Sequence, residues 1–414
     1  MKLTTLIFLT TLCLAKGNVV TRIGSPIVNT DTGFLPDHSQ LIEEYRKALH
    51  DFTIKIYKVA AFRGNYHFVI SPHSLWMTLA ALAEGSDFQT QPELYELLSL
   101  PRDPYLRKLY YDLAATRFSH TNDVGIIINR ALVIDEGVTP NPHWYDFVTK
   151  HSLLTVVSAP IRRNSLLAAT AIRQVVAANF PALNLRGNSV LLDTLDYNGL
   201  WTTAFADAVV KRAPFYDQSG KQVGSVDLMR VKRHGRIGYL ESIQTKILEL
   251  PVGINGQFSM VFALFTGETI LEPVVKDFKG SIMFDGLSVM KDSKVPIDVA
   301  LPQFRMNTEL DAKIILQDLN ITRLWTDPAV TRYISDPPAL PSSYVQRSTV
   351  TLSKEGVFHP PPPTLRSYHP DPEDQFFSEF IANRPFMFGL FDRETYTCLI
   401  AIMFTQPTFP IDNQ

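Results

Sequence analysis

The amino-acid sequence predicts an α+β protein, with helices concentrated in the first half of the chain and strands in the second. The 414 residues are 45% apolar and 19% charged, which supplies enough apolar material for a large core. Strand-like runs after about residue 189 follow one another without regularly alternating helices, and this order favours antiparallel sheets. The formal net charge of −2 gives no reason to expect a nucleic-acid partner.

The first residues predict export from the cell. A basic start, Met1-Lys2, precedes an apolar run over residues 3–14, a pattern typical of a secretory signal peptide over residues 1–17. The run is shorter than the roughly 18–20 apolar residues that span a membrane, and no later stretch is long enough. Residues 18–39 are polar and punctuated by Gly and Pro, so we expect a flexible N-terminal arm there.

In the first half of the chain, apolar spacing predicts helices separated by short strands. Apolar positions recur every three or four residues from Leu41 to Val59, which indicates an amphipathic helix over 41–60. The other expected elements are a strand at 68–70, a helix at 74–84 closed by Gly85, and helices across 91–183 interrupted by a strand at 125–135.

The second half consists of strands divided by turn residues such as Gly253 and Gly256. We expect strands at 190–195, 247–250, 258–265, 297–304, 348–352 and 397–404, and a single late helix at 309–319. Cys398 lies in the last strand, whereas Cys13 would leave with the signal peptide. The mature chain therefore can form no internal disulfide, and Cys398 is expected to act as a small buried apolar side chain.

Six segments, spread over nearly the whole mature chain, carry a family pattern in their order and spacing. They are Ile70-Ser71-Pro72-His73-Ser74-Leu75, Ile127-Ile128-Asn129-Arg130-Ala131-Leu132-Val133, Asn198-Gly199-Leu200-Trp201, Leu248-Glu249-Leu250-Pro251, Val299-Ala300-Leu301-Pro302-Gln303-Phe304 and Asn383-Arg384-Pro385-Phe386-Met387-Phe388. Together they resemble the serpin family. The resemblance implies a single serpin-like domain over residues 40–414. Helices would pack on large antiparallel or mixed sheets, and a reactive-centre loop would be exposed at about 354–384. The resemblance also implies that a protease cuts this loop and that the freed segment adds to a sheet as a new strand.

The expected loop departs from the family in its hinge, Gly356-Val357-Phe358-His359-Pro360-Pro361-Pro362-Pro363. Thr or Ser followed by Ala is usual where this chain has Val357, Phe358 and His359. Proline has no N–H for a strand ladder and fixes φ at about −65°. Each proline would cost on the order of 3 kcal/mol in a regular element, so the sequence predicts a loop that cannot insert.

The resemblance also places the bond that a protease would cut. Counting from Gly356, it falls near Pro370-Asp371, a poor substrate for most proteases. Arg366 is the alternative position for a trypsin-like cut, since no other Lys or Arg occurs between Gly356 and Asn383.

Beneath the main sheet, the family has a small polar network called the shutter. Ser71 and Ser74 match its serines, whereas Asp193 stands where Asn is usual and Gln346 where His is usual. An acid lacks the donors of an amide and adds a charge that is costly to bury unpaired. The change either alters the gate through which a strand enters the sheet or is neutral drift in a solvated pocket.

Three other signals bear on partners and modification. Asn320-Ile321-Thr322 is a glycosylation sequon. His359 and His369 lack the further ligands that a metal site needs, and no motif for catalysis or for a cofactor occurs. A local basic cluster would suit weak glycosaminoglycan binding, although a solvated charged face is the simpler interpretation. This cluster consists of Arg230, Lys232, Arg233 and Arg236.

These observations favour a secreted, monomeric, serpin-fold protein that is not an enzyme and is non-inhibitory. It would act by binding or signalling in extracellular fluid through a protein partner. The alternative function is inhibition of a serine or cysteine protease through the loop around Arg366 to Asp371. A third function, carriage of a small molecule in a pocket against a sheet, is allowed by the apolar content but demanded by no residue.

Overall fold

The computed structural model describes residues 37–118, 124–176, 185, 187–205, 209–266, 271–358 and 375–410. The helices of these residues are α1 (His38–Arg63), α2 (Pro72–Glu84), α3 (Thr90–Leu97), α4 (Pro104–Phe118), α5 (Pro142–Lys150), α6 (Ser165–Val176), α7 (Leu271–Asp277), α8 (Gly280–Val289) and α9 (Ala312–Asp318). The strands are β1 (Phe68–Ile70), β2 (Ile126–Asp135), β3 (Thr139–Pro140), β4 (Thr155–Ala159), β5 (Ser189–Tyr197), β6 (Trp201–Thr203), β7 (Val209–Tyr216), β8 (Gln222–Arg233), β9 (Arg236–Leu240), β10 (Thr245–Val252), β11 (Phe258–Phe265), β12 (Lys291–Asp292), β13 (Ile297–Asp311), β14 (Ser335–Asp336), β15 (Pro341–Leu352), β16 (Gly356–Phe358), β17 (Glu379–Ile381), β18 (Phe386–Asp392), β19 (Cys398–Phe404) and β20 (Phe409–Pro410).

Two large sheets organise the molecule. The first, called the long sheet below, has the order β20-β8-β13-β15-β5-β2-β4, with β7 beside β8 and β17 beside β13. Its central pair, β15 and β5, is parallel and hydrogen-bonded directly, from Tyr344 opposite Leu191 to Val350 opposite Tyr197. The second sheet has the order β1-β19-β18-β11-β10-β6-β16, with β9 beside β10 and β12 beside β9.

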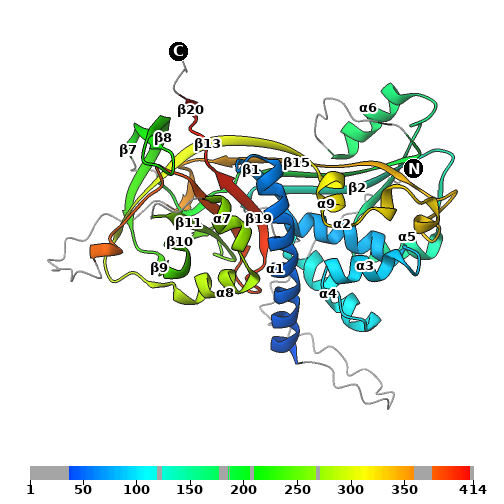
Figure 1. Cartoon of the computed structure of the whole chain (residues 1–414), viewed down its shortest axis with the longest axis horizontal. Coiled ribbons are helices and arrows are strands. Elements are labelled where there is room, and N and C mark those ends of the chain that lie inside the picture. The colour runs from blue at the N-terminus through cyan, green and yellow to red at the C-terminus, as the bar shows by residue number, and fades with distance from the viewer. Residues whose placement is uncertain are drawn as a thin grey trace, which may run out of the picture.

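Helices cover both faces of the long sheet. Figure 1 shows α6 on one side of β2 and β5, and the cluster of α2, α3, α4 and α5 on the other. Between the two sheets lies an aromatic-rich core in which Phe304 stacks on Phe404 with ring centroids 4.6 Å apart. These layers confirm the predicted α+β class with large mixed sheets.

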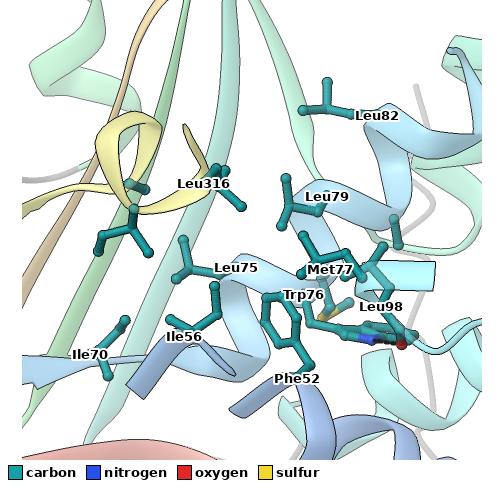
Figure 2. Close-up of a cluster of buried hydrophobic side chains, with 14 of the residues drawn as sticks. Phe52, Ile56, Ile70, Leu75, Trp76, Met77, Leu79, Leu82, Leu98 and Leu316 are labelled. Atoms are coloured by element: carbon teal, nitrogen blue, oxygen red, sulfur yellow. Dashed lines mark hydrogen bonds between the residues drawn. The ribbon is translucent and has the colours of Figure 1, made fainter. Parts of the chain in front are cut away.

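Helix α2 shows why the sequence folds as it does beneath the long sheet. Ser71 caps its N-terminus by accepting a hydrogen bond from the Ser74 amide, and Pro72 occupies the first turn, where a missing N–H costs nothing. Every residue of the helix from Pro72 to Ala83 is buried. Figure 2 shows its side chains packing against Phe52 of α1, and the Trp76 indole N–H donates to the Leu98 carbonyl at 3.0 Å.

The predicted elements are confirmed with four corrections. The first helix begins at His38 and ends at Arg63, beyond both predicted limits. The late helix covers only Ala312–Asp318, because residues 309–311 continue β13 by pairing with β15. Strand β4 lies in a region where only helices were expected after residue 135, and helices α7 and α8 interrupt a region interpreted as strands. The sheets are mixed, as the family resemblance implied, since β15 runs parallel to β5 and β2 parallel to β4.

Candidate functional site

The first part of the predicted hinge leaves the long sheet and joins the second sheet. After β15 ends, residues Gly356–Phe358 form β16 and pair in parallel with β6, with Gly356 opposite Trp201 and Phe358 opposite Thr203. The Trp201 amide donates to the Glu355 carbonyl at 3.1 Å, and the Ala204 amide donates to the Phe358 carbonyl at 2.7 Å. The start of the hinge is therefore engaged as an edge strand outside the long sheet.

Two buried aromatic residues hold the segment just before the hinge. The Trp201 indole N–H donates to the Ser353 carbonyl at 2.8 Å, and the Phe205 amide donates to the Lys354 carbonyl at 2.7 Å. The two rings lie against each other with centroids 5.4 Å apart. The sequence predicted the hinge but not these contacts, because they join segments about 150 positions apart.

Gly356 is packed so closely that no side chain fits. A Cβ placed there would lie 2.4 Å from both the backbone N and the Cα of Ala204. Because backbone atoms cannot swing aside as a flexible side chain can, the close approach of β16 to Ala204 requires glycine.

Most of the predicted reactive loop lies outside the described residues. This applies to His359, to the prolines at 360–363 and to the candidate cleavage positions Arg366, Pro370 and Asp371. The described chain resumes at Gln375, where Lys246 of β10 holds the far end of the loop. Its ammonium group donates to the carbonyls of Phe376 at 2.8 Å and Glu379 at 3.2 Å, and burial lowers the pKa of Lys246.

The four predicted shutter residues lie together where the start of α2 meets β5 and β15. The Ser71 amide donates to Gln346 Oε1 at 2.8 Å, and Gln346 Nε2 donates back to the Ser71 carbonyl at 3.1 Å. The Ser71 hydroxyl donates to the Leu399 carbonyl at 2.8 Å, and the Ser74 hydroxyl donates to Asp193 Oδ2 at 3.1 Å. The network thus joins α2 to both central strands of the long sheet and to β19.

Asp193 is fully buried and accepts two further hydrogen bonds that sequence reasoning did not foresee. Thr78 Oγ1 donates to Oδ1 at 2.9 Å, and the Tyr344 hydroxyl donates to Oδ2 at 2.9 Å. Burial raises the pKa of Asp193 to about 6, against the opposing pull of Arg130 and the three hydroxyl donors. Asp193 therefore does not lie in a solvated pocket.

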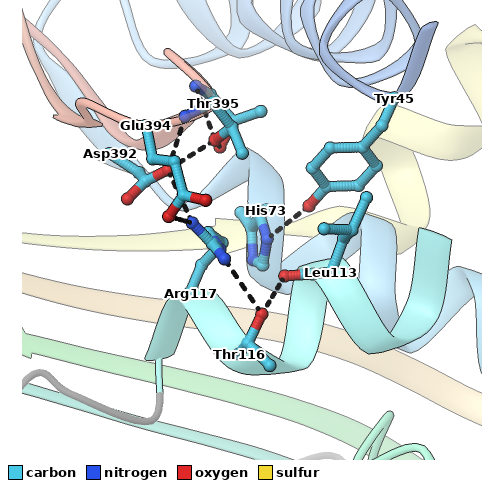
Figure 3. A network of polar contacts seen from close by, with 9 residues as sticks. Tyr45, His73, Leu113, Thr116, Arg117, Asp392, Glu394 and Thr395 are labelled. Atoms are coloured by element: carbon cyan, nitrogen blue, oxygen red, sulfur yellow. Dashed lines mark hydrogen bonds and ion pairs between the residues drawn. The ribbon is translucent and has the colours of Figure 1, made fainter. Parts of the chain in front are cut away.

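A partly buried ionic network lies between α4 and the turn that joins β18 to β19, and it was also missed. The Arg117 guanidinium of α4 bonds Asp392 Oδ2 at 3.3 Å and Glu394 Oε2 at 2.6 Å (Figure 3). The Thr395 hydroxyl and amide donate to the same Asp392 oxygen at 2.6 and 2.9 Å. No local sequence pattern predicts this network, because α4 and the turn between β18 and β19 are far apart in the sequence.

The predicted basic cluster is spread over two strands and mostly engaged by the chain itself. Arg230 forms a bidentate salt bridge with Asp298, and Arg236 forms a salt bridge with Glu249. Arg233 donates to the Ala204 carbonyl at 2.9 Å, and its burial lowers its pKa to about 10. A sulfated glycan would therefore have to compete with the carboxylates that pair with Arg230 and Arg236, while Lys232 is exposed.

An apolar cavity lies between α1, α8 and the second sheet. It has a volume of about 110 Å³ and is walled by residues that include Tyr57, Met283, Ile247 and Cys398. Cys398 is 2% exposed, which confirms its prediction as a buried thiol.

Asn320, the predicted glycan acceptor, is exposed at the end of α9 with φ of 66°.

Two absences hold for the described part of the chain. No helix there is long and apolar enough to cross a membrane. In the same residues, no three His, Cys, Asp or Glu side chains gather as a metal site would require.

Comparison with known proteins assigns the fold to a family. Two mixed sheets, a helical cluster beneath the first, and a long segment between β16 and β17 define the architecture. The model of the serpin (serine protease inhibitor) family matches residues 47–407. Because this match covers most of the chain, the protein belongs to the serpin family, whose members are mostly protease inhibitors rather than enzymes.

Individual relatives are distant. The chain is 22% identical over 370 residues to an uncharacterized serpin-like protein of Thermococcus kodakarensis, covering 85% of this chain and 83% of that protein. It is 21% identical over 364 residues to Serpin B5 of Xenopus tropicalis, covering 83% of this chain and 92% of the relative. The crystal structure of mouse protein-Z dependent protease inhibitor has a TM-score of 0.77 at 18% identity, covering 90% of this chain and 100% of that one. The structural likeness shows the shared fold.

Proposed function

We propose that this chain is a secreted serpin that does not trap proteases and that acts by binding or signalling through a protein partner in extracellular fluid. The observation that carries the proposal is the hinge. Its first three residues are engaged in β16 on the edge of the second sheet, and the next five in the sequence are His359 and four prolines.

Insertion of the loop would have to overcome three separate barriers. The directly paired strands β15 and β5 must part, and β16 must leave β6. Four prolines must then enter a ladder to which they donate no N–H, at on the order of 3 kcal/mol each. Their total is about as large as the net stability of an ordinary domain, roughly 5–15 kcal/mol.

The first test is the formation of a covalent complex. The mature protein would be incubated with trypsin-, chymotrypsin-, elastase- and papain-like enzymes, with a known inhibitory serpin as positive control. We expect loop cleavage without an adduct that survives SDS. One adduct of summed mass that is lost in Arg366→Ala would overturn the proposal and establish the alternative, an active inhibitor using the loop around Arg366.

The second test is heat resistance after cleavage. Insertion of a freed strand completes the sheet and would raise the melting temperature on the order of tens of degrees, well beyond the effect of one ordinary mutation. Protein nicked between residues 364 and 371 is expected to melt at nearly the same temperature as intact protein. A large rise would mean that the prolines are accommodated.

A hinge repair tests whether the prolines are the cause. Residues 357–363 would be replaced by Thr and Ala at constant length, with Gly356 kept because of its close contact with Ala204. If the rest of the protein can accept the loop as a strand, the repaired protein gains heat resistance after it is nicked. If the repaired protein gains none, Asp193 and Gln346 of the shutter are the next candidates for the cause, and they would be changed together to Asn and His.

Secretion and glycosylation form part of the same proposal. Asn320 is exposed, as an acceptor for a glycan must be. Expression in a secretory host should yield a protein that begins near residue 18, runs as a monomer and loses mass on treatment with an N-glycanase. Asn320→Gln should remove that mass change.

A second candidate function is carriage of a small apolar molecule in the cavity beside α8. The cavity of about 110 Å³ is lined almost wholly by apolar side chains. It is smaller than the roughly 300–1,000 Å³ of drug-sized ligand sites, so only a small ligand fits without movement of α8. Gly286→Leu would fill it from the helix side, and abolished uptake of a hydrophobic fluorescent probe by this variant would support the assignment.

A further inference from the structure

The centre of the long sheet contains an ionisable group at the junction that must open for any strand to enter. Asp193 lies in β5 directly opposite Gln346 of β15, and its carboxyl bonds Tyr344 of β15 as well as Ser74 and Thr78 of α2. One buried carboxyl thus ties both central strands to the helix beneath them.

The charged and titratable groups nearest to Asp193 along the chain elements around it come from β2, α2 and β15. From β2, Arg130 attracts the carboxylate, while its guanidinium also donates to the carbonyls of Leu153 at 2.8 Å and Ser152 at 3.0 Å. From α2, His73 is buried beside Ser74, and burial lowers its pKa well below the usual value, so it stays neutral. From β15, Tyr344 donates its hydroxyl proton and burial raises its pKa, so it remains a donor.

We propose that Asp193 is a proton-controlled gate in the long sheet. Protonation of its carboxyl favours the closed pair of β5 and β15, and ionisation favours their separation. The physical reason is burial: the closed sheet excludes water from the carboxyl, whereas separation of the strands would hydrate it. This proposal concerns opening of the sheet and stands whether or not the loop can insert.

The sign and size of the effect follow from linkage. Burial raises the pKa of Asp193 from 3.8 to about 6 in the closed sheet. The stability that the neutral acid gives to the closed state is therefore complete below pH 3.8 and is lost as the pH rises through about 6. If the opened carboxyl regains its ordinary pKa, the opening equilibrium increases about 100-fold across this interval.

Hydrogen exchange measured by mass spectrometry tests the gate on the full mature protein. Peptides covering β5 and β15 would be followed from pH 5 to 8, corrected for the intrinsic exchange rate, with β11 and β18 as internal reference. In the wild type, protection of β5 and β15 should fall by about 10-fold relative to the reference between pH 5 and 8, because the rest of the roughly 100-fold change lies below pH 5. In Asp193→Asn, protection should not depend on pH. A flat wild-type profile, or the same slope in the variant, would overturn the proposal.

A second variant keeps the test decisive if Asp193→Asn does not fold. Tyr344→Phe retains the carboxyl but removes one donor that favours its charged form, so the midpoint of the pH profile should move to higher pH. The matched control is Tyr57→Phe, another buried tyrosine, whose hydroxyl donates to the Ile402 carbonyl away from the gate. The control should leave the midpoint in place. An unmoved midpoint in Tyr344→Phe would contradict the role of Asp193.

Discussion

Replacement of Gly356 by alanine should detach the hinge from the second sheet. A Cβ at this position would lie 2.4 Å from two backbone atoms of Ala204, about 1 Å closer than ordinary van der Waals contact allows. Strand β16 must move away by a similar distance. The Ala204 amide now donates a hydrogen bond to the Phe358 carbonyl at 2.7 Å, and this N···O distance would then exceed hydrogen-bonding range.

The size of the effect follows from the bonds at risk. Three backbone hydrogen bonds hold this segment, donated by Trp201, Ala204 and Phe205. Each contributes about 0.5–1.5 kcal/mol net, and the loss of glycine flexibility in the unfolded chain returns about 0.4–1 kcal/mol. We therefore expect Gly356→Ala to lower the free energy of unfolding by about 1–3 kcal/mol, which is also the range for overpacking.

The assay is urea unfolding combined with hydrogen exchange of residues 201–205. The control is Gly137→Ala, because a Cβ there would approach only Asp135 Oδ2, at 3.5 Å. Gly356→Ala should lower the midpoint and expose the amides of Trp201 and Ala204, whereas the control should do neither. Equal midpoints and unchanged protection in both variants would refute the argument that β16 is held by this close contact.

Three further changes have expected outcomes. Arg117→Ala should destabilise the protein by about 3 kcal/mol in urea unfolding, since it leaves the buried carboxylate of Asp392 without its cation. Leu75→Ala, at a position 2% exposed in the core of α2, should cost about 3 kcal/mol, measured in the same way. Burial lowers the pKa of His50 to about 4, so the stability that its neutral ring gives the folded protein is present above pH 6.5 and is lost as the pH falls through 4. His50→Gln should therefore make the free energy of unfolding less dependent on pH on the acid side.

The sequence was sufficient to predict the fold wherever a local pattern and a family motif coincided. Helix α2 is an example, because Ser71, Pro72 and Gly85 mark its ends and the residues between them are apolar. Helix α8 was missed because Gly280 and Gly286 weaken its helical pattern and its side chains are apolar on most faces. The end of β13 was assigned to a helix because pairing with β15, a tertiary contact, overrides the local preference of residues 309–311.

The candidate site was predicted in its parts but not in its connections. The resemblance to the family singled out Ser71, Ser74, Asp193 and Gln346, and in the structure these residues share one hydrogen-bond network. The partners Thr78 and Tyr344 carry no motif, and they reach Asp193 only because α2 packs beneath β5 and β15. Contacts of this kind depend on the register between remote strands, which no periodicity in the sequence encodes.

The hinge and the shutter act on the same strand from its two ends. Near the start of β15, Gln346 belongs to the shutter and Tyr344 donates a hydrogen bond to it. Just past the end of β15, the carbonyl of Ser353 accepts a hydrogen bond from Trp201. Separation of β15 from β5 therefore requires both anchors to yield, while the pairing between them must break as well. Under the proposed function, a chain that must release two ends and then accommodate prolines is not expected to insert its loop. In the proposed gate, ionisation of Asp193 weakens only the shutter end, so we expect pH to change how often the sheet opens and not whether the hinge enters it.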